Sequence, residues 1–228
     1  MPSPEERLRA FYELRATEEP ETDPEAALRF RKALRAAGLA PGERLLDIGA
    51  KWGGLGECAR SLGLKIEYTG LELSEEHARR AAELGFDVRQ ADASAPLPIA
   101  DHAYHCVVCL ELLEHLPTPL GLLAEIRRVL RPEGRAILSV PNPYNWIEIY
   151  RELFRRPDPE GHLNGFTTPV MENLLALAGL RLERRLGTSV RIPKTLRLLS
   201  TDSILARSRI YIARPAEQLA FAGRELHH

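Results

Sequence analysis

The sequence predicts a doubly wound α/β fold built on a mostly parallel sheet. From residue 44 onward, short apolar runs alternate with helical segments. The runs are apolar on both faces, which is typical of parallel strands that helices cover on both sides. With 228 residues, 44% of them apolar and 28% charged, the chain has the composition of a globular protein with one large core. We therefore expect a single α/β domain.

Two amphipathic helices are expected before the first strand, over residues 4–16 and 23–37. Asp23 is a good N-cap, Pro24 suits the first helical position, and Gly38 suits the end of the second helix. The N-terminal segment is charged and has no apolar stretch, so we expect no signal peptide. No window approaches the length of a membrane span. These features predict a cytoplasmic protein.

Five apolar runs are expected to form the first strands of the sheet, at residues 44–50, 65–73, 86–92, 104–110 and 135–141. Helical patterns follow the first, second and fourth runs, at residues 53–62, 74–84 and 118–130. A proline-containing loop follows the third run instead. This order of elements predicts parallel strands joined by helical crossovers.

The region 142–170 mixes aromatic residues, prolines and a few polar groups. Such a composition favours an irregular excursion over the carboxyl edge of the sheet, so we predict that this region forms the substrate side. After it, we expect a helix at 170–177 ended by Gly179, strands at 180–190 and 208–215, and between them a basic stretch around Lys194 and Arg197 with a short helix.

The charge and the cysteines exclude several classes of function. The 31 basic and 32 acidic residues leave a net charge of −1, so there is no global attraction to nucleic acid or to an anionic membrane. The three cysteines, Cys58, Cys106 and Cys109, are few and odd in number, as expected in a reducing compartment. Cys106 and Cys109 are three residues apart on a predicted strand, which places their side chains on opposite faces. We expect two core residues there and no metal site in the chain.

The segment LLDIGAKWGG, which begins at Leu45, ends the first predicted strand and begins a helix. In open parallel sheets, ligands bind beyond the carboxyl ends of the strands, where the strand order reverses. Gly49 and Gly53 allow the backbone to pass close to a ligand, and the helix near Gly54 offers unpaired N–H groups and the positive end of its dipole. This segment alone is weak evidence for a nucleotide-like ligand.

Acidic residues at the ends of successive strands strengthen that evidence. After Asp47, Glu72 ends the second strand and Asp92 ends the third. Glu72 can accept both hydroxyl hydrogens of a ribose, with a helix-entry acid before Ser74 as the alternative. Asp92 can accept from the exocyclic amine of an adenine. The fourth strand adds three further polar residues to the same rim, Glu111, Glu114 and His115.

Four segments carry a family resemblance: LLDIGAKWGG, GLELSEE, QADASAPLPIADHAYHCVVCLELLEHL and RVLRPEGRAILSVPNP. In order and spacing, they resemble the class I S-adenosylmethionine-dependent methyltransferases, in particular the small-molecule enzymes similar to ubiquinone/menaquinone-biosynthesis methyltransferases. The resemblance runs from about Pro41 to Pro143 and continues more faintly to the last strand. It is specific for fold and cofactor and weak for the substrate.

The resemblance implies a Rossmann-like sheet of seven strands with the final strand antiparallel, an S-adenosylmethionine cofactor and an S-adenosylhomocysteine product. Its cofactor-binding residues would be Asp47, Gly49, Ala50, Lys51 and Gly53 around the methionine part, Glu72 on the ribose, Leu73 against the adenine, Asp92 and Ala93 at the adenine edge, and Leu110 and Glu111 over the sulfonium. The domain would divide into an N-terminal helical lid (1–40), a cofactor-binding core (41–141), a substrate-side cap (142–170), the last helix and strands (171–215) and a tail (216–228).

The acceptor implied by the resemblance is a small molecule rather than a nucleic acid. Methyl transfer needs an in-line nucleophile, and a general base matters only for a hydroxyl or an acidic carbon. His162 is our first candidate for a base because imidazole titrates near neutrality, and Tyr144 is the second, for orienting an acceptor. A loop histidine and a packing tyrosine are the alternatives. His115 belongs to an E-H-L pattern and is expected to pack within the rim.

Four alternative functions follow from the same residues. A dinucleotide dehydrogenase requires G-x-G-x-x-G, which the segment GAKWGG lacks. An aminopropyl transferase shares the fold, but no acidic amine pocket is evident. A catalytically silent cofactor-binding relative is favoured by Lys51 at the usual middle glycine and by His105 after Tyr104, where the family generally has an acid. An RNA methyltransferase has a similar glycine-poor loop, although the near-neutral charge counts against it.

Overall fold

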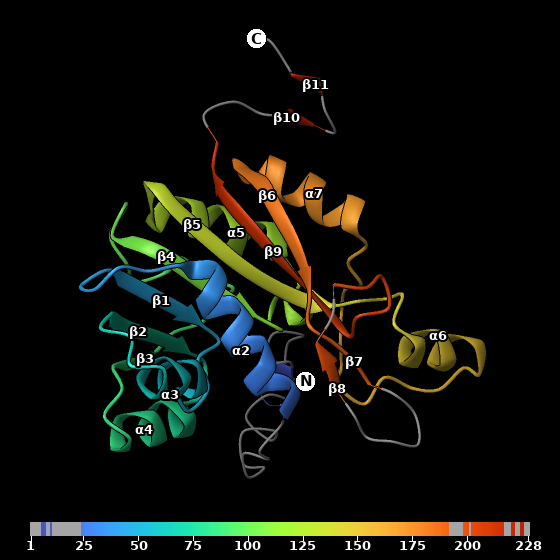
Figure 1. Cartoon of the computed structure of the whole chain (residues 1–228), viewed down its shortest axis with the longest axis horizontal. Coiled ribbons are helices and arrows are strands. Elements are labelled where there is room, and N and C mark those ends of the chain that lie inside the picture. The colour runs from blue at the N-terminus through green and yellow to red at the C-terminus, as the bar shows by residue number, and fades with distance from the viewer. Residues whose placement is uncertain are drawn as a thin grey trace.

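The computed structural model of the chain (Figure 1) describes residues 6–7, 10, 24–191, 198–200, 202–216, 220–221 and 224–225. The main helices are α2 (Pro24–Ala37), α3 (Gly54–Ser61), α4 (Glu75–Glu83), α5 (Pro119–Val129), α6 (Trp146–Leu153) and α7 (Thr168–Leu177). The strands of the main sheet are β1 (Arg44–Ile48), β2 (Glu67–Glu72), β3 (Val88–Gln90), β4 (Tyr104–Leu110), β5 (Leu130–Pro141), β6 (Leu180–Gly187) and β9 (Ser208–Pro215). A short 3-10 helix, η1 (Leu113–His115), follows β4.

The seven strands form one mostly parallel sheet in the order β3-β2-β1-β4-β5-β9-β6. Strands β1 to β5 pair in parallel, whereas β9 runs antiparallel to both β5 and β6. The predicted fold class and the antiparallel last strand are therefore confirmed. The strand order reverses between β1 and β4, so the carboxyl ends of these two strands form the switch point at which ligands bind in open sheets.

Helices cover both faces of this sheet because its strands are apolar on both sides. One core packs α2 and α3 against residues such as Leu45 and Val108 of the central strands. The other packs α5 and α7 against residues such as Leu46 and Val107. Cys106 lies in the first core and Cys109 in the second, and both are fully buried and free. The prediction of opposite faces is confirmed.

The structure differs from the expected elements mainly after residue 130. Strand β5 begins at Leu130 rather than at 135, because Leu130 already pairs with Tyr104 before an irregularity in the register. The region expected to be irregular contains α6, whose cap Asn145 accepts hydrogen bonds from the backbone N–H groups of Ile147 and Glu148. In the region where a basic stretch and a short helix were expected, β7 (Ser189–Arg191) and β8 (Leu198–Ser200) pair antiparallel, and residues 192–197 between them lie outside the described residues.

Several expected features fall on parts of the chain that the structure does not describe. Most of the first helix, the Asp23 cap, the basic stretch around Lys194 and Arg197 and most of the tail lie outside the described residues. Within those residues, no helix is long and apolar enough to cross a membrane. Two strands near the C-terminus, β10 (Ala220–Phe221) and β11 (Arg224–Glu225), pair with each other.

Candidate functional site

Backbone strain marks the switch point between β1 and β4. Lys51, in the turn after β1, has a left-handed φ of 47°, and Glu111, directly after β4, has one of 52°. Only glycine adopts this region without a steric penalty, and such strain is concentrated at functional sites. Gly53 has a φ of 86°, and a Cβ there would lie 2.8 Å from Cδ2 of Phe86. The glycine at 53 is therefore required both by its backbone and by its neighbour.

The carboxylate of Glu72 ties together the segments after β1 and β2. The backbone N–H of Lys51 donates to Oε2 at 2.8 Å, and that of Ser74 donates to Oε1 at 2.9 Å. Burial raises the pKa of Glu72, but hydrogen bonds from His77, Ser74 and Lys51 outweigh burial and lower it overall. Each oxygen of an ionised carboxylate has two lone pairs. Glu72 thus holds the loop as a charged group, and because Oε1 also faces Nδ1 of His77, at 3.8 Å, the acceptor position that it retains is on Oε2.

Asp47 points into the protein below this loop. Its side chain is 4% exposed, and the hydroxyl of Tyr68 donates to Oδ2 at 2.7 Å. Burial raises the pKa of Asp47 to about 7; the hydrogen bond from Tyr68 opposes the rise, and the charge of Glu72 adds to it. Gly49 and Ala50 continue the loop, and their backbone N–H groups both donate to the carbonyl of Leu71. The loop is thus fixed to β2 by its backbone as well as by Glu72.

The predicted adenine-binding residues lie at the ends of β2 and β3. Asp92 is exposed, and its Oδ1 accepts from the backbone N–H of Ser94, which closes a tight turn. Leu73 and Ala93 are half-buried, and the side chain of Gln90 donates to the carbonyl of Leu73. The three strand-end acids therefore differ in environment, since Asp47 is buried, Glu72 bridges two segments and Asp92 is accessible.

Glu111 holds the rim beyond β4, next to the half-buried Leu110. Its carboxylate accepts hydrogen bonds from the hydroxyls of Ser139 (2.7 Å) and Ser208 (2.9 Å). Arg29 of α2 approaches the same carboxylate, at 3.8 Å. Glu111 thus joins β4, β5, β9 and α2 at one point of the rim.

Beside this point, the structure brings His162 next to Glu114 and His115, which the sequence had placed together on this rim without it. One ligand atom from each of Glu114, His115 and His162 lies within 4.8 Å of those of the other two. The backbone N–H groups of Leu163 and Asn164 both donate to the carbonyl of Glu114, so the excursion after β5 folds back onto the β4 rim. His162 lies 47 residues after His115 along the chain, and only the fold brings the two together.

Glu114 is the most unusual member of the group. It is 1% exposed, and neither carboxylate oxygen accepts a hydrogen bond within the described residues. Burial and the neighbouring charge of Glu111 raise its pKa well above the usual range, while Arg29 opposes this rise. A buried polar group without a partner is rare and requires an explanation.

The two predicted catalytic residues lie in different environments. Nδ1 of His162 is 2.9 Å from Oδ2 of Asp158, and its Nε2 is 3.5 Å from Oε2 of Glu160. Glu160 and then Asp158 raise the pKa of His162, against burial. Tyr144 is 47% exposed and does not belong to the group around His162. The structure thus places His162 on the rim and Tyr144 at the surface of the excursion.

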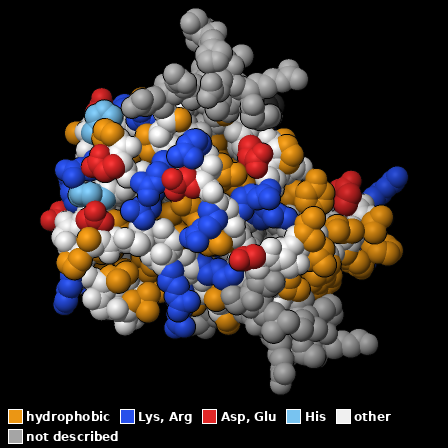
Figure 2. Space-filling model, turned by 45° about the horizontal axis from the view of Figure 1, so that its top comes forward, with side chains coloured by type: hydrophobic (Ala, Val, Ile, Leu, Met, Phe, Trp, Pro, Cys, Tyr) orange, Lys and Arg blue, Asp and Glu red, His pale blue; other side chains and the backbone are white. Residues whose placement is uncertain are grey.

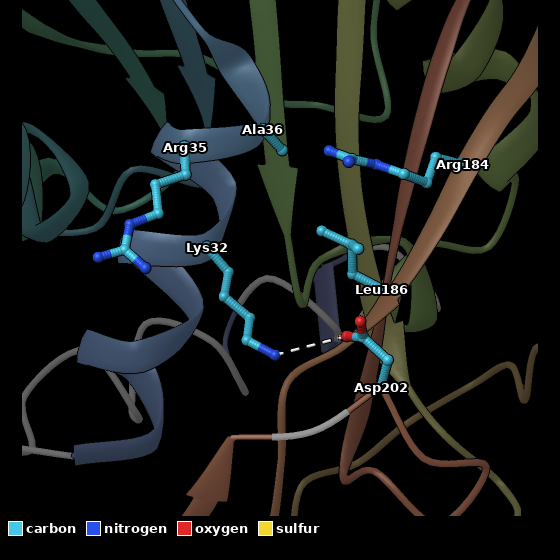
Figure 3. A pocket seen from close by; sticks show the side chains of 6 residues that line it. All are labelled: Lys32, Arg35, Ala36, Arg184, Leu186 and Asp202. Atoms are coloured by element: carbon cyan, nitrogen blue, oxygen red, sulfur yellow. Dashed lines mark ion pairs between the residues drawn. The ribbon is translucent and has the colours of Figure 1, made fainter.

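A hollow of about 180 Å³ lies between α2 and β6 (Figure 3). Its lining residues are Lys32, Arg35, Ala36, Arg184, Leu186 and Asp202. Lys32 lies 3.6 Å from Asp202 and also donates to the carbonyl of Gly187. None of the predicted site residues lines this hollow. His105 is also remote from the rim, since it lies at the start of β4 and Nδ1 accepts from the backbone N–H of Arg44.

Comparisons with known proteins agree with this geometry. A family model described as a methyltransferase domain matches residues 21–184. A ubiquinone biosynthesis O-methyltransferase of Aromatoleum aromaticum is 39% identical over 114 residues, which cover 47% of each chain. One from Vibrio cholerae is 31% identical over 144 residues, which cover 59% of this chain and 58% of the relative. The chain thus spans about half the length of the curated relatives it matches.

Solved structures share the fold at low sequence identity. A SAM-dependent methyltransferase from Archaeoglobus fulgidus has a TM-score of 0.65 and 20% identity, over 83% of this chain and 92% of that one. The [4+2]-cyclase SpnF has a TM-score of 0.63 and 19% identity, over 84% and 81%. At such identities, the likeness describes the fold only, because one fold serves different reactions.

Proposed function

This chain belongs to the methyltransferase domain family, and on that premise we propose that it transfers a methyl group from S-adenosylmethionine to a hydroxyl oxygen of a small planar molecule. The chain is an S-adenosylmethionine-dependent methyltransferase. The names of the O-methylating relatives support the choice of oxygen as the nucleophile. The aromatic residues of the excursion, among them Tyr144, Trp146 and Tyr150, support a planar acceptor.

We assign the cofactor to the rim of β1 to β4. The observation that carries this assignment is Glu72, whose charged carboxylate holds the loop after β1 and keeps an acceptor position on Oε2 for a ribose hydroxyl. Asp47, Gly49, Ala50, Lys51 and Gly53 would enclose the methionine part. The exposed ammonium of Lys51 would pair with the methionine carboxylate there. The strained loop would then serve a ligand that carries a carboxylate and needs no pyrophosphate cradle.

The remaining cofactor contacts follow from the neighbouring strand ends. Leu73 would lie against the adenine, with Asp92 and Ala93 at the edge of that ring. Leu110 and Glu111 would close the site near the sulfonium. In this arrangement, residues 41–141 form the cofactor-binding core, residues 142–170 cap the acceptor, and the N-terminal helices act as a lid.

We assign His162 the part of general base for the acceptor. A hydroxyl nucleophile must lose its proton, which a positioned imidazole can accept. Asp158 and Glu160, on the same segment as His162, raise its pKa and so favour proton uptake. Tyr144 would orient the acceptor from the surface of the cap. Most of the acceleration would come from holding the hydroxyl in line with the activated methyl group.

Calorimetry with S-adenosylhomocysteine tests the cofactor assignment. We expect binding in the micromolar range together with a rise in Tm, because a ligand that binds only the folded state stabilises it. The absence of both heat and a thermal shift would contradict the assignment. Transfer of a labelled methyl group to simple phenols and catechols tests the acceptor class. Labelling of amines alone would contradict the choice of oxygen.

A further inference from the structure

We propose that Glu114, His115 and His162 form a binding site for a divalent transition metal ion such as Zn²⁺. Two imidazoles and one carboxylate are a donor set that Zn²⁺ and Fe²⁺ accept in proteins. The three side chains each bring one ligand atom within 4.8 Å of the other two, close enough to share one ion. They come from η1 and from the loop before α7, which are joined by the two backbone hydrogen bonds to Glu114.

The carboxylate of Glu114 is the first independent reason for this proposal. It is 1% exposed, and neither oxygen has a hydrogen-bond partner within the described residues. Removing a carboxylate from water without a partner is costly, and buried charges in proteins are paired or bind metals. The charge of Arg29 acts on Glu114, but its Nη1 lies 3.8 Å from Oε2 of Glu111, and no hydrogen bond joins it to Glu114 within the described residues. An ion held between Glu114 and the two histidines would supply the missing partner.

The environment of His162 is the second reason. Its Nδ1 lies 2.9 Å from Oδ2 of Asp158, and the same oxygen accepts from the backbone N–H of His162. Histidines that bind metals almost always donate their other ring N–H to a carboxylate or carbonyl, which fixes the tautomer and the ring orientation. Asp158 would thereby leave Nε2 as the lone-pair donor. Among the described residues, Nε2 has no partner with hydrogen-bond geometry, and Oε2 of Glu160 lies 3.5 Å from it, near enough to offer a further oxygen ligand.

The position of the ion has a consequence for the reaction, which rests on the proposed function. The group adjoins the β4 rim, where Leu110 and Glu111 would close over the sulfonium. A metal ion that binds a hydroxyl oxygen acidifies it and orients it. His162 would then act as a ligand, and the ion would take over the task of generating the nucleophile. The two roles proposed for His162, general base and metal ligand, are therefore distinguishable by experiment.

The test measures Zn²⁺ binding to the full chain without cofactor or acceptor. Because the chain ends in His227 and His228, both are first replaced by alanine, so that a terminal histidine pair contributes no binding. The protein is stripped with a chelator, and Zn²⁺ is titrated in competition with a chromophoric chelator. A Co²⁺ spectrum reports the coordination. We expect one Zn²⁺ per chain and a rise in Tm on binding.

Four substitutions in that background decide the outcome. Glu114→Gln and His162→Gln each remove a ligand and should weaken Zn²⁺ binding by more than 100-fold. Asp158→Asn should weaken it by about 10- to 100-fold, as the loss of a hydrogen-bonded carboxylate behind a ligand does. His102→Gln is the matched control, because His102 is exposed and its Nδ1 lies 2.9 Å from the carbonyl of Leu130, outside the group. This variant should bind Zn²⁺ with the same affinity as the parent chain.

Two results would overturn the proposal. One is a parent chain that binds no Zn²⁺. The other is binding that Glu114→Gln and His162→Gln leave unchanged. Circular dichroism is used to check that each variant is folded. If Glu114→Gln does not fold, His162→Gln, which lies on a surface loop, still tests the metal site. Binding of S-adenosylhomocysteine is measured separately. A chain that binds this ligand but no Zn²⁺ therefore refutes the metal site alone, whereas the converse refutes the cofactor assignment alone.

Discussion

Two rims of the same sheet edge differ in how far the chain satisfies its own polar groups. The β1–β2 rim (residues 47–53 and 72–74) is internally complete, because Glu72 accepts from two backbone N–H groups and Asp47 accepts from Tyr68. The β4 rim (residues 110–115 with 158–164) contains a buried carboxylate that accepts no hydrogen bond within the described residues. The first rim is preorganised by the chain alone, whereas the second keeps unpaired polar atoms that the proposed ion would complete.

Surface composition follows the same division. No residue of α6 is buried, although the helix carries Trp146, Ile149 and Leu153. Hydrophobic side chains gather at the right of Figure 2, the side on which α6 lies in Figure 1. Exposed apolar groups close to incompletely paired polar groups are the composition of a site that binds an apolar molecule with one polar handle.

Asp47→Asn should produce the largest change, in the pH dependence of stability. The folded-state pKa of Asp47, about 7, lies above its ordinary value of 3.8. Between these two pKa values, the folded chain binds one more proton than the unfolded chain. The contribution of protonated Asp47 to the unfolding free energy is therefore complete below pH 4 and is lost as the pH rises through 7. Between pH 4 and 7, the unfolding free energy of the wild type should fall by up to about 4 kcal/mol relative to that of Asp47→Asn. Urea unfolding between pH 5 and 8 measures the part of this loss that lies above pH 5, about 3 kcal/mol.

Asp87→Asn is the matched control for that experiment. The hydrogen bond from Arg89 lowers the pKa of Asp87, against burial, so its contribution is lost only at acid pH. The difference between wild type and Asp87→Asn should stay constant between pH 5 and 8. A constant difference for Asp47→Asn as well would mean that Asp47 is ionised in the folded chain. The β1–β2 rim would then contain a buried, charged acid of its own.

Glu72→Ala should weaken binding of S-adenosylhomocysteine by about 1.5–3 kcal/mol, the value of hydrogen bonds to a charged group. Because Glu72 also holds Lys51 and Ser74, we expect the unfolding free energy to fall as well. Calorimetry and urea unfolding measure the two effects. Glu75→Ala, at an exposed position in the first turn of α4, is the control and should leave the affinity unchanged. If Glu72→Ala also leaves it unchanged, Glu72 does not bind the ribose.

Lys51→Gly should change stability and affinity in opposite directions. Relief of the left-handed φ of 47° stabilises the loop, partly offset by the greater entropy of glycine in the unfolded chain. We expect a net gain of about 0.5–1 kcal/mol. Loss of the exposed ammonium should weaken cofactor binding by at most about 1 kcal/mol. Arg155→Gly, which relieves a similar φ of 48° on the excursion, should stabilise the chain without changing the affinity. Equal affinities for Lys51→Gly and wild type would show that Lys51 does not contact the cofactor.

The strand ends and the helix cap of the β1–β2 rim were predicted from the sequence because their signals are local. The first strand, β1, is a short, mostly apolar run followed by the turn glycines Gly49 and Gly53, and Ser74 is a side-chain cap. The atypical Lys51 became interpretable only with its φ value, because the sequence does not reveal which turn residue adopts the left-handed region.

The β4 rim could not be predicted to the same extent. The group of Glu114, His115 and His162 depends on hydrogen bonds between segments about 50 residues apart, and no local pattern encodes these. Helix α6 was missed because Pro141 and Pro143 dominate the segment before it, although Asn145 is a standard N-cap. The long β5 was missed because Pro132 and Gly134 punctuate its first half, which pairs with β4 only at Leu130.

The smallest effect on stability is expected on α6, where Ile149→Ser/Leu153→Ser should change the unfolding free energy by less than about 0.5 kcal/mol per site. Both side chains are exposed, Leu153 at 73%, so that their loss removes little buried apolar surface. The matched substitution Leu175→Ala, at a fully buried position of α7, should cost about 2–5 kcal/mol. If α6 caps the acceptor, the double variant should nevertheless raise the acceptor KM while leaving S-adenosylhomocysteine binding unchanged. A large loss of stability would mean instead that α6 is packed against other parts of the chain, and the contrast between a complete and an incomplete rim would then not extend to this helix.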